Sequence, residues 1–156
     1  MNQTELKIKT AQIGQCGVLL LQFELLRNCI VSAPMTTDSG VDLVAYSPKS
    51  GKAITIQVKT NKEAKRGGGK GRNALDWWIS TKNTAQYIAF VDLKSKSIWM
   101  FKKDEIPHVA QQKSGGKHHF YMYIDDDVKT RTGNAAHCYE FKKFLLENKI
   151  HEVFEI

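Results

Sequence analysis

The side chains best suited to chemistry lie close together in residues 40–60, GVDLVAYSPKSGKAITIQVKT. Asp42, Gln57 and Lys59 interrupt two otherwise apolar runs, and a turn containing Pro and Gly separates those runs, so we expect a β-hairpin. If the pairing is symmetric about this turn, Asp42 faces Gln57 at the roughly 5 Å that separates directly paired side chains. Lys59 follows two residues after Gln57, on the same face of the strand. The hairpin therefore predicts a carboxylate, an amide and an ammonium group in one place.

This combination suits the hydrolysis of phosphodiester bonds. Mg²⁺ is usually held by one or two carboxylates together with waters and substrate oxygens, and a bound metal lowers the pKa of its water. Asp42 and the amide oxygen of Gln57 can serve as ligands, and Lys59 can position the attacking water or stabilise developing charge. A plainer alternative is also compatible with the alternation: Gln57 and Lys59 on a solvated face, and Asp42 as a hydrogen-bonding residue where the strand starts.

Length and charge indicate the class of protein. The 156 residues predict a single domain spanning 1–156, and the content of 42% hydrophobic and 25% charged residues is typical of a globular chain. The formal net charge of +7 favours a polyanionic partner such as nucleic acid, although a basic surface alone would also account for it.

The cysteines and the amino terminus bear on the cellular compartment. Cys16, Cys29 and Cys138 are an odd number without a C-x-x-C spacing, which favours reduced thiols over disulfides or a zinc site. The amino terminus lacks an apolar signal core, and no apolar run approaches the roughly 18 residues of a membrane helix. We therefore expect a cytoplasmic protein with no membrane contact.

The elements before the hairpin should support it. Apolar residues recur at helical spacing over residues 4–28, which predicts one long helix. Gly14 and Gly17 lie inside that helix and indicate that another element packs closely there. Glu24 is the one carboxylate in the apolar second half of the helix. The run 29–33, ended by a proline, predicts an edge strand.

A glycine-rich basic segment follows the hairpin. Residues 62–72, KEAKRGGGKGR, cannot bury a face and predict a mobile loop, which is either a solvated linker or a phosphate-binding element. We favour phosphate binding because the loop leaves directly from the strand that carries Lys59. The expected nucleic-acid-binding residues are Lys62, Lys65, Arg66, Lys70 and Arg72.

The remainder of the chain predicts the body of the domain. Trp77 and Trp78 must point to opposite faces of their element, so at least one is a core residue, and stacking of the other on a base is the less favoured interpretation. His118 and His119 lie in a polar stretch and are expected in a solvent-exposed turn. Patterning further predicts strands at 87–93, 97–101, 120–124 and 151–156, and helices at 104–111 and 136–148.

The order of a helix, then GVDL, then a turn, then IQVKT resembles the PD-(D/E)XK superfamily, which includes restriction endonuclease-like and Holliday junction resolvase-like nucleases. This resemblance covers residues 14–60. It implies an α/β fold with a mixed central β-sheet flanked by helices. It also implies that Asp42 binds Mg²⁺ or Mn²⁺, that Lys59 acts on the nucleophile, that the substrate is DNA, and that a homodimer cuts both strands.

The chain departs from the superfamily pattern at two positions. Gln57 stands where the carboxylate of (D/E)XK is usual, and Gly17 falls near the helix Glu of relatives that carry QVK. Glu24, two turns further along the helix, is either the third ligand beside Asp42 and Gln57 or an unrelated exposed residue of the helix. The leading hypothesis is a metal-dependent DNA endonuclease. The alternatives are a catalytically inactive nucleic-acid-binding module of the same fold and a protein-interaction subunit.

Overall fold

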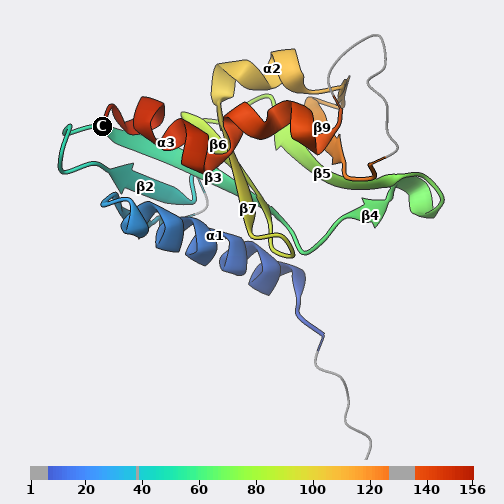
Figure 1. The fold of residues 1–156 in the computed structure, drawn as a ribbon, viewed down its shortest axis with the longest axis horizontal. Coiled ribbons are helices and arrows are strands. Elements are labelled where there is room, and N and C mark those ends of the chain that lie inside the picture. The colour runs from blue at the N-terminus through green and yellow to red at the C-terminus, as the bar shows by residue number, and fades with distance from the viewer. Residues whose placement is uncertain (1–6, 38, 127–135) are drawn as a thin grey trace, which may run out of the picture.

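A computed structural model describes residues 7–37, 39–126 and 136–156 (Figure 1). No helix in these ranges combines the length and the apolar character needed to cross a membrane. In chain order the elements are α1 (Thr10–Arg27), β1 (Val31–Pro34), β2 (Leu43–Tyr46), β3 (Ala53–Asn61), β4 (Lys65–Arg66), the 3-10 helix η1 (Gly67–Gly69), β5 (Asn73–Ser80), β6 (Tyr87–Asp92), β7 (Ser97–Lys102), the 3-10 helix η2 (Lys103–Glu105), α2 (Ile106–Val109), β8 (Gln112–Ser114), β9 (Lys117–Tyr123), the 3-10 helix η3 (Cys138–Phe144) and α3 (Leu146–Phe154).

The central sheet has five strands in the order β1-β2-β3-β6-β7. β3 and β6 pair in parallel and the other pairs are antiparallel, so the sheet is mixed. The predicted hairpin of β2 and β3, the edge position of β1, and the antiparallel pairing of β6 with β7 are all confirmed. Every residue of β6 is buried, as its continuous apolar run predicts for a strand covered on both faces.

Helices α1 and α3 cover one face of this sheet (Figure 1). Leu21 and Leu25 of α1 are fully buried, and they belong to the same apolar cluster as Ile54 and Ile56 of β3. Residues two apart in a strand share a face, so this packing assigns alternate residues of β3 to the helix side. The residues between them point to the opposite face of the sheet.

A second sheet, in the order β4-β5-β9-β8, packs against that opposite face. Its core is aromatic: the ring of Trp77 lies 4.8 Å from that of Phe90, and Phe120 lies 5.0 Å from Phe90 and 5.3 Å from Phe101. The cluster takes its central-sheet members from β6 and β7 and none from β2 or β3. The second sheet thus covers half of the face and leaves the hairpin half outside this core.

Three expectations about the later part of the chain are wrong. Residues 62–72 are not a structureless loop, because β4 pairs with β5 and η1 follows it. His118 and His119 lie within strand β9 and are only partly exposed, not in a turn. Residues 151–156 do not form a strand, because α3 continues to Phe154 and buries Leu146, Ile150 and Val153 at helical spacing. The helix expected over 136–148 is η3 followed by the start of α3.

The two glycines of α1 have different surroundings. A Cβ at Gly17 would lie 2.9 Å from both Cβ and Cγ2 of Thr60 and closer still to its hydroxyl, whereas a Cβ at Gly14 would meet nothing within 4 Å. Thr60 is β-branched and stiff, so it cannot swing clear at low cost. The close approach of α1 to β3 therefore requires glycine at position 17 and not at position 14.

We predict opposite effects of alanine at these two positions. Gly17→Ala should destabilise the protein by about 1–3 kcal/mol through overpacking, whereas Gly14→Ala should stabilise it by about 1 kcal/mol through helix propensity. Chemical denaturation of both variants measures the difference. A double variant with Thr60→Ala should recover part of the loss, and a Gly17→Ala protein as stable as Gly14→Ala would contradict the packing.

Candidate functional site

The hairpin brings Asp42 and Gln57 opposite one another. Leu43 pairs with Ile56 in the register of β2 and β3, so the next position along pairs Asp42 with Gln57, as the sequence predicts. Leu43 and Ile56 are buried on the helix side. Alternation therefore directs Asp42, Gln57 and Lys59 to the face that the second sheet leaves uncovered.

Two backbone contacts fix Asp42. Its main-chain N–H donates to the carbonyl of Ile56 at 2.9 Å, and its Oδ2 accepts from the N–H of Val58 at 2.6 Å. The carboxylate thus takes the place of a main-chain acceptor where β2 begins. Its second oxygen, Oδ1, has no hydrogen-bond donor in the described part of the chain. One oxygen holds the side chain in place, and the other is available to a ligand.

A residue that the pattern analysis did not single out fixes Gln57. The amide nitrogen of Asn83 donates to Gln57 Oε1, and Oδ1 of Asn83 accepts from the N–H of Ala85 at 2.7 Å. Asn83 is 8% exposed, so a buried amide holds the Gln57 side chain in one orientation. An amide oxygen has two lone pairs, so Gln57 Oε1 retains one for a ligand. No local signal marks Asn83, which lies in the polar turn after β5.

Lys59 supplies an uncompensated positive charge to the same face. The side chain is partly buried, and no described carboxylate forms an ion pair with its ammonium. A partly buried ammonium without a counter-ion is well placed to attract an anion, because its field is less screened than that of an exposed lysine. The arrangement favours binding of a phosphate group near Lys59.

The donors at this site are few and consist of oxygen. Within residues 7–37, 39–126 and 136–156, no three His, Cys, Asp or Glu side chains are grouped to hold a metal ion. Mg²⁺ keeps several of its waters and needs only one or two carboxylates from the protein. Asp42 Oδ1 and Gln57 Oε1 fit such a cation, and they would be its protein ligands.

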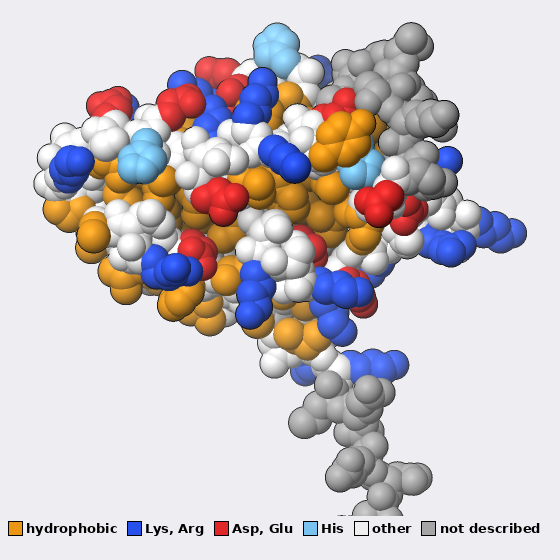
Figure 2. Space-filling model, in the orientation of Figure 1, with side chains coloured by type: hydrophobic (Ala, Val, Ile, Leu, Met, Phe, Trp, Pro, Cys, Tyr) orange, Lys and Arg blue, Asp and Glu red, His pale blue; other side chains and the backbone are white. Residues whose placement is uncertain are grey.

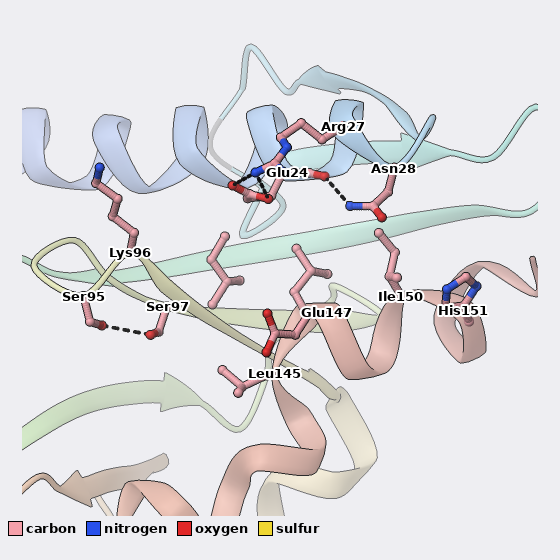
Figure 3. Close-up of a pocket in the computed structure, with 12 residues that line it drawn as sticks. Glu24, Arg27, Asn28, Ser95, Lys96, Ser97, Leu145, Glu147, Ile150 and His151 are labelled. Carbon is pink, nitrogen blue, oxygen red and sulfur yellow. Dashed lines mark hydrogen bonds and ion pairs between the residues drawn. The ribbon is translucent and has the colours of Figure 1, made fainter.

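Glu24 lies elsewhere in the fold. Its carboxylate pairs with Arg27 at 3.4 Å, and it lines a groove of about 410 Å³ together with Ser97 of β7 and His151 of α3 (Figure 3). Between β2 and β7 there are three strand spacings of about 4.8 Å each, and α1 covers the face opposite to the side chain of Asp42. The structure does not bring Glu24 to the hairpin, so we remove it from the set of ligands.

Glu24 is the one carboxylate of α1, so this helix has no other residue that could replace the acidic ligand missing at Gly17. At Gly17, Thr60 near the end of β3 occupies the space that a side chain would need. A carboxylate side chain at position 17 is therefore excluded by packing and not only by sequence. Among the described residues, the site contains one carboxylate, from Asp42, the Gln57 amide with the Asn83 amide that orients it, and the Lys59 ammonium.

The basic segment forms an arm at the end of the same strand. Beyond Lys59, the amide of Asn61 donates to the carbonyl of Asp76 in β5 at 2.7 Å, and the chain then enters β4. Lys65 and Arg66 of β4 are exposed. Figure 1 shows β4 projecting from the body of the molecule, and Figure 2 shows Lys and Arg side chains at that end.

The base of the arm is held by a carboxylate. Asp125 accepts from the N–H of Asn73 at 2.9 Å and from its side-chain amide at 3.1 Å. The hydrogen bonds from Asn73 hold the pKa of Asp125 below its usual range, with a further contribution from Arg72 and Arg66. Asp125 is therefore ionised at neutral pH and attaches the chain after β9 to the start of β5.

The arm borders a groove of about 460 Å³ on the outer face of the second sheet. Its walls combine cationic side chains with aromatic ones: Lys65, Arg66, Arg72, His119, Tyr121 and Tyr123. The sequence identified the cations from composition, but the aromatic wall comes from β9, some fifty residues later. Only the pairing of β5 with β9 brings them together.

Comparisons with known proteins agree with this architecture. No protein-family model matches the chain, and no curated protein matches it. Among solved structures, the bacterial homing endonuclease I-Ssp6803I is similar at 14% identity and a TM-score of 0.61, over 96% of this chain and 94% of the other. The Holliday junction resolvase Hjc of Archaeoglobus fulgidus is similar at 16% identity and a TM-score of 0.48, over 72% of this chain and 84% of the other.

The extent of the first match, together with the mixed sheet and its flanking helices, identifies the architecture. The chain has the restriction endonuclease-like fold of the PD-(D/E)XK nucleases.

Proposed function

We propose that this protein is a metal-dependent endonuclease that hydrolyses DNA phosphodiester bonds at the β2–β3 hairpin. The observation that carries the proposal is the juxtaposition of Asp42, Gln57 and Lys59 on the uncovered half of the sheet. Each of the first two is held in place by a hydrogen bond to a neighbour and retains acceptor capacity. The restriction endonuclease-like fold and the net charge of +7 support DNA as the substrate.

The residues of the site have separate roles in this proposal. Asp42 and Gln57 hold Mg²⁺ or Mn²⁺, and such a cation polarises the phosphate and lowers the pKa of its bound water. Lys59 donates hydrogen bonds to a non-bridging phosphate oxygen or to the attacking water, where its charge stabilises the negative charge that develops. Lys62, Lys65, Arg66, Lys70 and Arg72 bind flanking phosphates from the arm.

A second candidate is a binding module of the same fold that does not cleave DNA. The observation that favours it is that Asp42 is the single carboxylate at the site within the described ranges, since Glu24 lies away from the hairpin and Gly17 leaves no room for a side chain. The module would bind DNA in a salt-sensitive way and independently of Asp42. A protein-interaction subunit, the third candidate, predicts no DNA binding even at low salt.

The outer surface of α1 supports a homodimer. Leu19, Phe23 and Leu26 lie one turn apart along one side of the helix and are 55%, 57% and 64% exposed. Hydrophobic side chains also gather along this edge of the molecule in Figure 2. An apolar strip on a single helix can pack against its own copy across a two-fold axis. Two copies would supply one active site for each DNA strand.

We predict that the hairpin residues are required for cleavage. Asp42→Asn and Lys59→Met should each reduce Mg²⁺-dependent cleavage of plasmid and branched DNA by about 10²-fold or more, because each removes a charge that acts on the reacting phosphate. Glu24→Gln is the matched control and should retain full activity. Cleavage that survives both hairpin substitutions would contradict the assigned site, and no cleavage by the unmodified protein would favour the binding module.

The arm should determine how strongly binding depends on salt. Lys65→Gln combined with Arg66→Gln should weaken DNA binding and flatten the slope of log affinity against log salt by about 2, roughly one for each lost phosphate contact. Lys96→Gln combined with Lys142→Gln removes the same charge from elsewhere on the surface and should leave the slope nearly unchanged. Equal effects of the two pairs would show that only the net charge matters.

The apolar strip should control oligomeric state. Phe23→Glu places charges opposite one another in a two-fold contact, so it should yield a monomer in light scattering coupled to gel filtration. Because Phe23 is exposed, the substitution should not change the circular dichroism spectrum or the midpoint of unfolding by more than a small amount. An unmodified protein that is monomeric at all concentrations would rule out this interface.

A further inference from the structure

Trp78 differs from the other two tryptophans in its environment. Trp77 and Trp99 are 4% and 5% exposed and lie in the aromatic core, whereas Trp78 is 43% exposed on the outer face of β5. At this exposure, Trp78 contributes less hydrophobic stabilisation than a buried tryptophan would. Neither the hairpin site nor the basic arm uses this residue.

The ring of Trp78 is held in a fixed orientation. It stacks on His119 of β9, with the ring centroids 4.1 Å apart and the planes 2° from parallel. His119 is fixed in turn, because its Nε2 lies 3.1 Å from Asp76 Oδ2 and its Nδ1 lies 3.4 Å from Gln112 Oε1. Three neighbouring residues thus maintain a flat indole surface before any ligand binds.

The flank of Trp78 opposite His119 has no strand beside it in the described structure. β9 pairs with β5 along one side from Ala74 to Ser80, whereas β4 pairs on the other side only with residues 73–74. On this second side the carbonyl of Asp76 accepts from Asn61, two residues beyond Lys59 on β3. The unpaired side of β5, which carries Trp78, therefore lies beside the end of the strand that carries the site.

The surroundings of the stack are suited to a nucleotide. Asp76 and His119 also line the groove that contains Lys65 and Arg66 of the arm. Cations that can hold phosphates therefore border the same rigid aromatic stack. Proteins bind unpaired nucleotides by this combination of a positively charged groove and aromatic side chains that stack on bases.

We infer that Trp78 is a stacking platform for an unpaired base, so that the DNA bound at this site carries an unpaired nucleotide next to the duplex. A base inside an intact duplex has both faces covered by its neighbours, and only an extruded or unpaired base offers a face to an indole. This inference rests on the proposed function for the identity of the polymer. It adds the structure of the substrate and a recognition residue outside the hairpin.

The test compares two DNA duplexes that differ only in one unpaired 2-aminopurine. Affinity is measured by anisotropy without divalent metal, so that no cleavage occurs. The unmodified protein should bind the bulged duplex about tenfold more tightly than the paired one, because a stacked base contributes about one factor of ten or more to affinity. Trp78→Ala should reduce that ratio to about one, and Trp78→Phe should retain most of it.

Further variants separate stacking from general damage. His119→Ala removes the support of the indole and should lower the ratio. Tyr46→Ala removes an exposed aromatic ring from the turn end of β2 and should leave the ratio unchanged. Because Trp77 and Trp99 are buried, protection of tryptophan emission from iodide by the bulged duplex would report on Trp78.

The outcomes distinguish this inference from the proposed endonuclease. A ratio that is near one in the unmodified protein, or that persists in Trp78→Ala, overturns the platform even if Asp42 and Lys59 prove necessary for cleavage. A ratio that depends on Trp78 in a protein that cleaves no DNA supports the platform and assigns it to a binding module. Unchanged accessibility of Trp78 on DNA binding would also overturn it, and would leave Trp78 as a contact for another protein.

Discussion

The strict alternation of side chains along β3 is the constraint on which the remainder of the structure depends. Ile54 and Ile56 pack against α1 in the core. Because neighbouring side chains of a strand alternate in direction, Gln57 and Lys59 lie on the opposite face. A shift of one residue in the pairing of β2 with β3 would bury Lys59 and expose the isoleucines at the same time. Burial of the isoleucines therefore fixes the pairing of β2 with β3, and this pairing in turn places the residues of the site.

The second sheet covers only part of the central sheet, so the polar side chains of β3 remain accessible on the part that it leaves open. The second sheet packs its aromatic face on β6 and β7, and this aromatic core includes no residue of β2 or β3. Two polar residues connect the two regions: Asn83 holds Gln57, and Asn61 connects β3 to β5. The same sheet thus stabilises half of the face and borders the half that it leaves open.

The distribution of charge follows from the same arrangement. The ammonium of Lys59 has no ion-pair partner among the described residues, and the chain leaves its strand directly into an arm rich in Lys and Arg. Lys59 and the cations of the arm therefore lie along one stretch of chain, with Glu63, paired with Lys94, between them. Some carboxylates elsewhere on the molecule are engaged locally, as Glu24 is with Arg27 and Glu155 with Lys52.

Local patterns in the sequence determined much of this protein. The apolar alternation around a Pro- and Gly-containing turn specified the β2–β3 hairpin and the pairing of Asp42 with Gln57. The continuous apolar run of β6 specified a strand buried on both faces. These features depend on residues close together in the chain, where periodicity reports directly on which side chains are buried.

The tertiary structure decided everything that depends on distant segments meeting. Helical spacing puts Glu24 two turns from Gly17, which predicted that it reaches the metal site. The fold instead places Glu24 beside residues of β7 and α3. Pairing with β5 ordered a glycine-rich arm that composition alone assigns to a loop, and burial on a helix face overrode the strand-like alternation of residues 151–156. Asn83 and the stack of Trp78 on His119 carry no local signal, because packing between elements is not encoded in the period of any one of them.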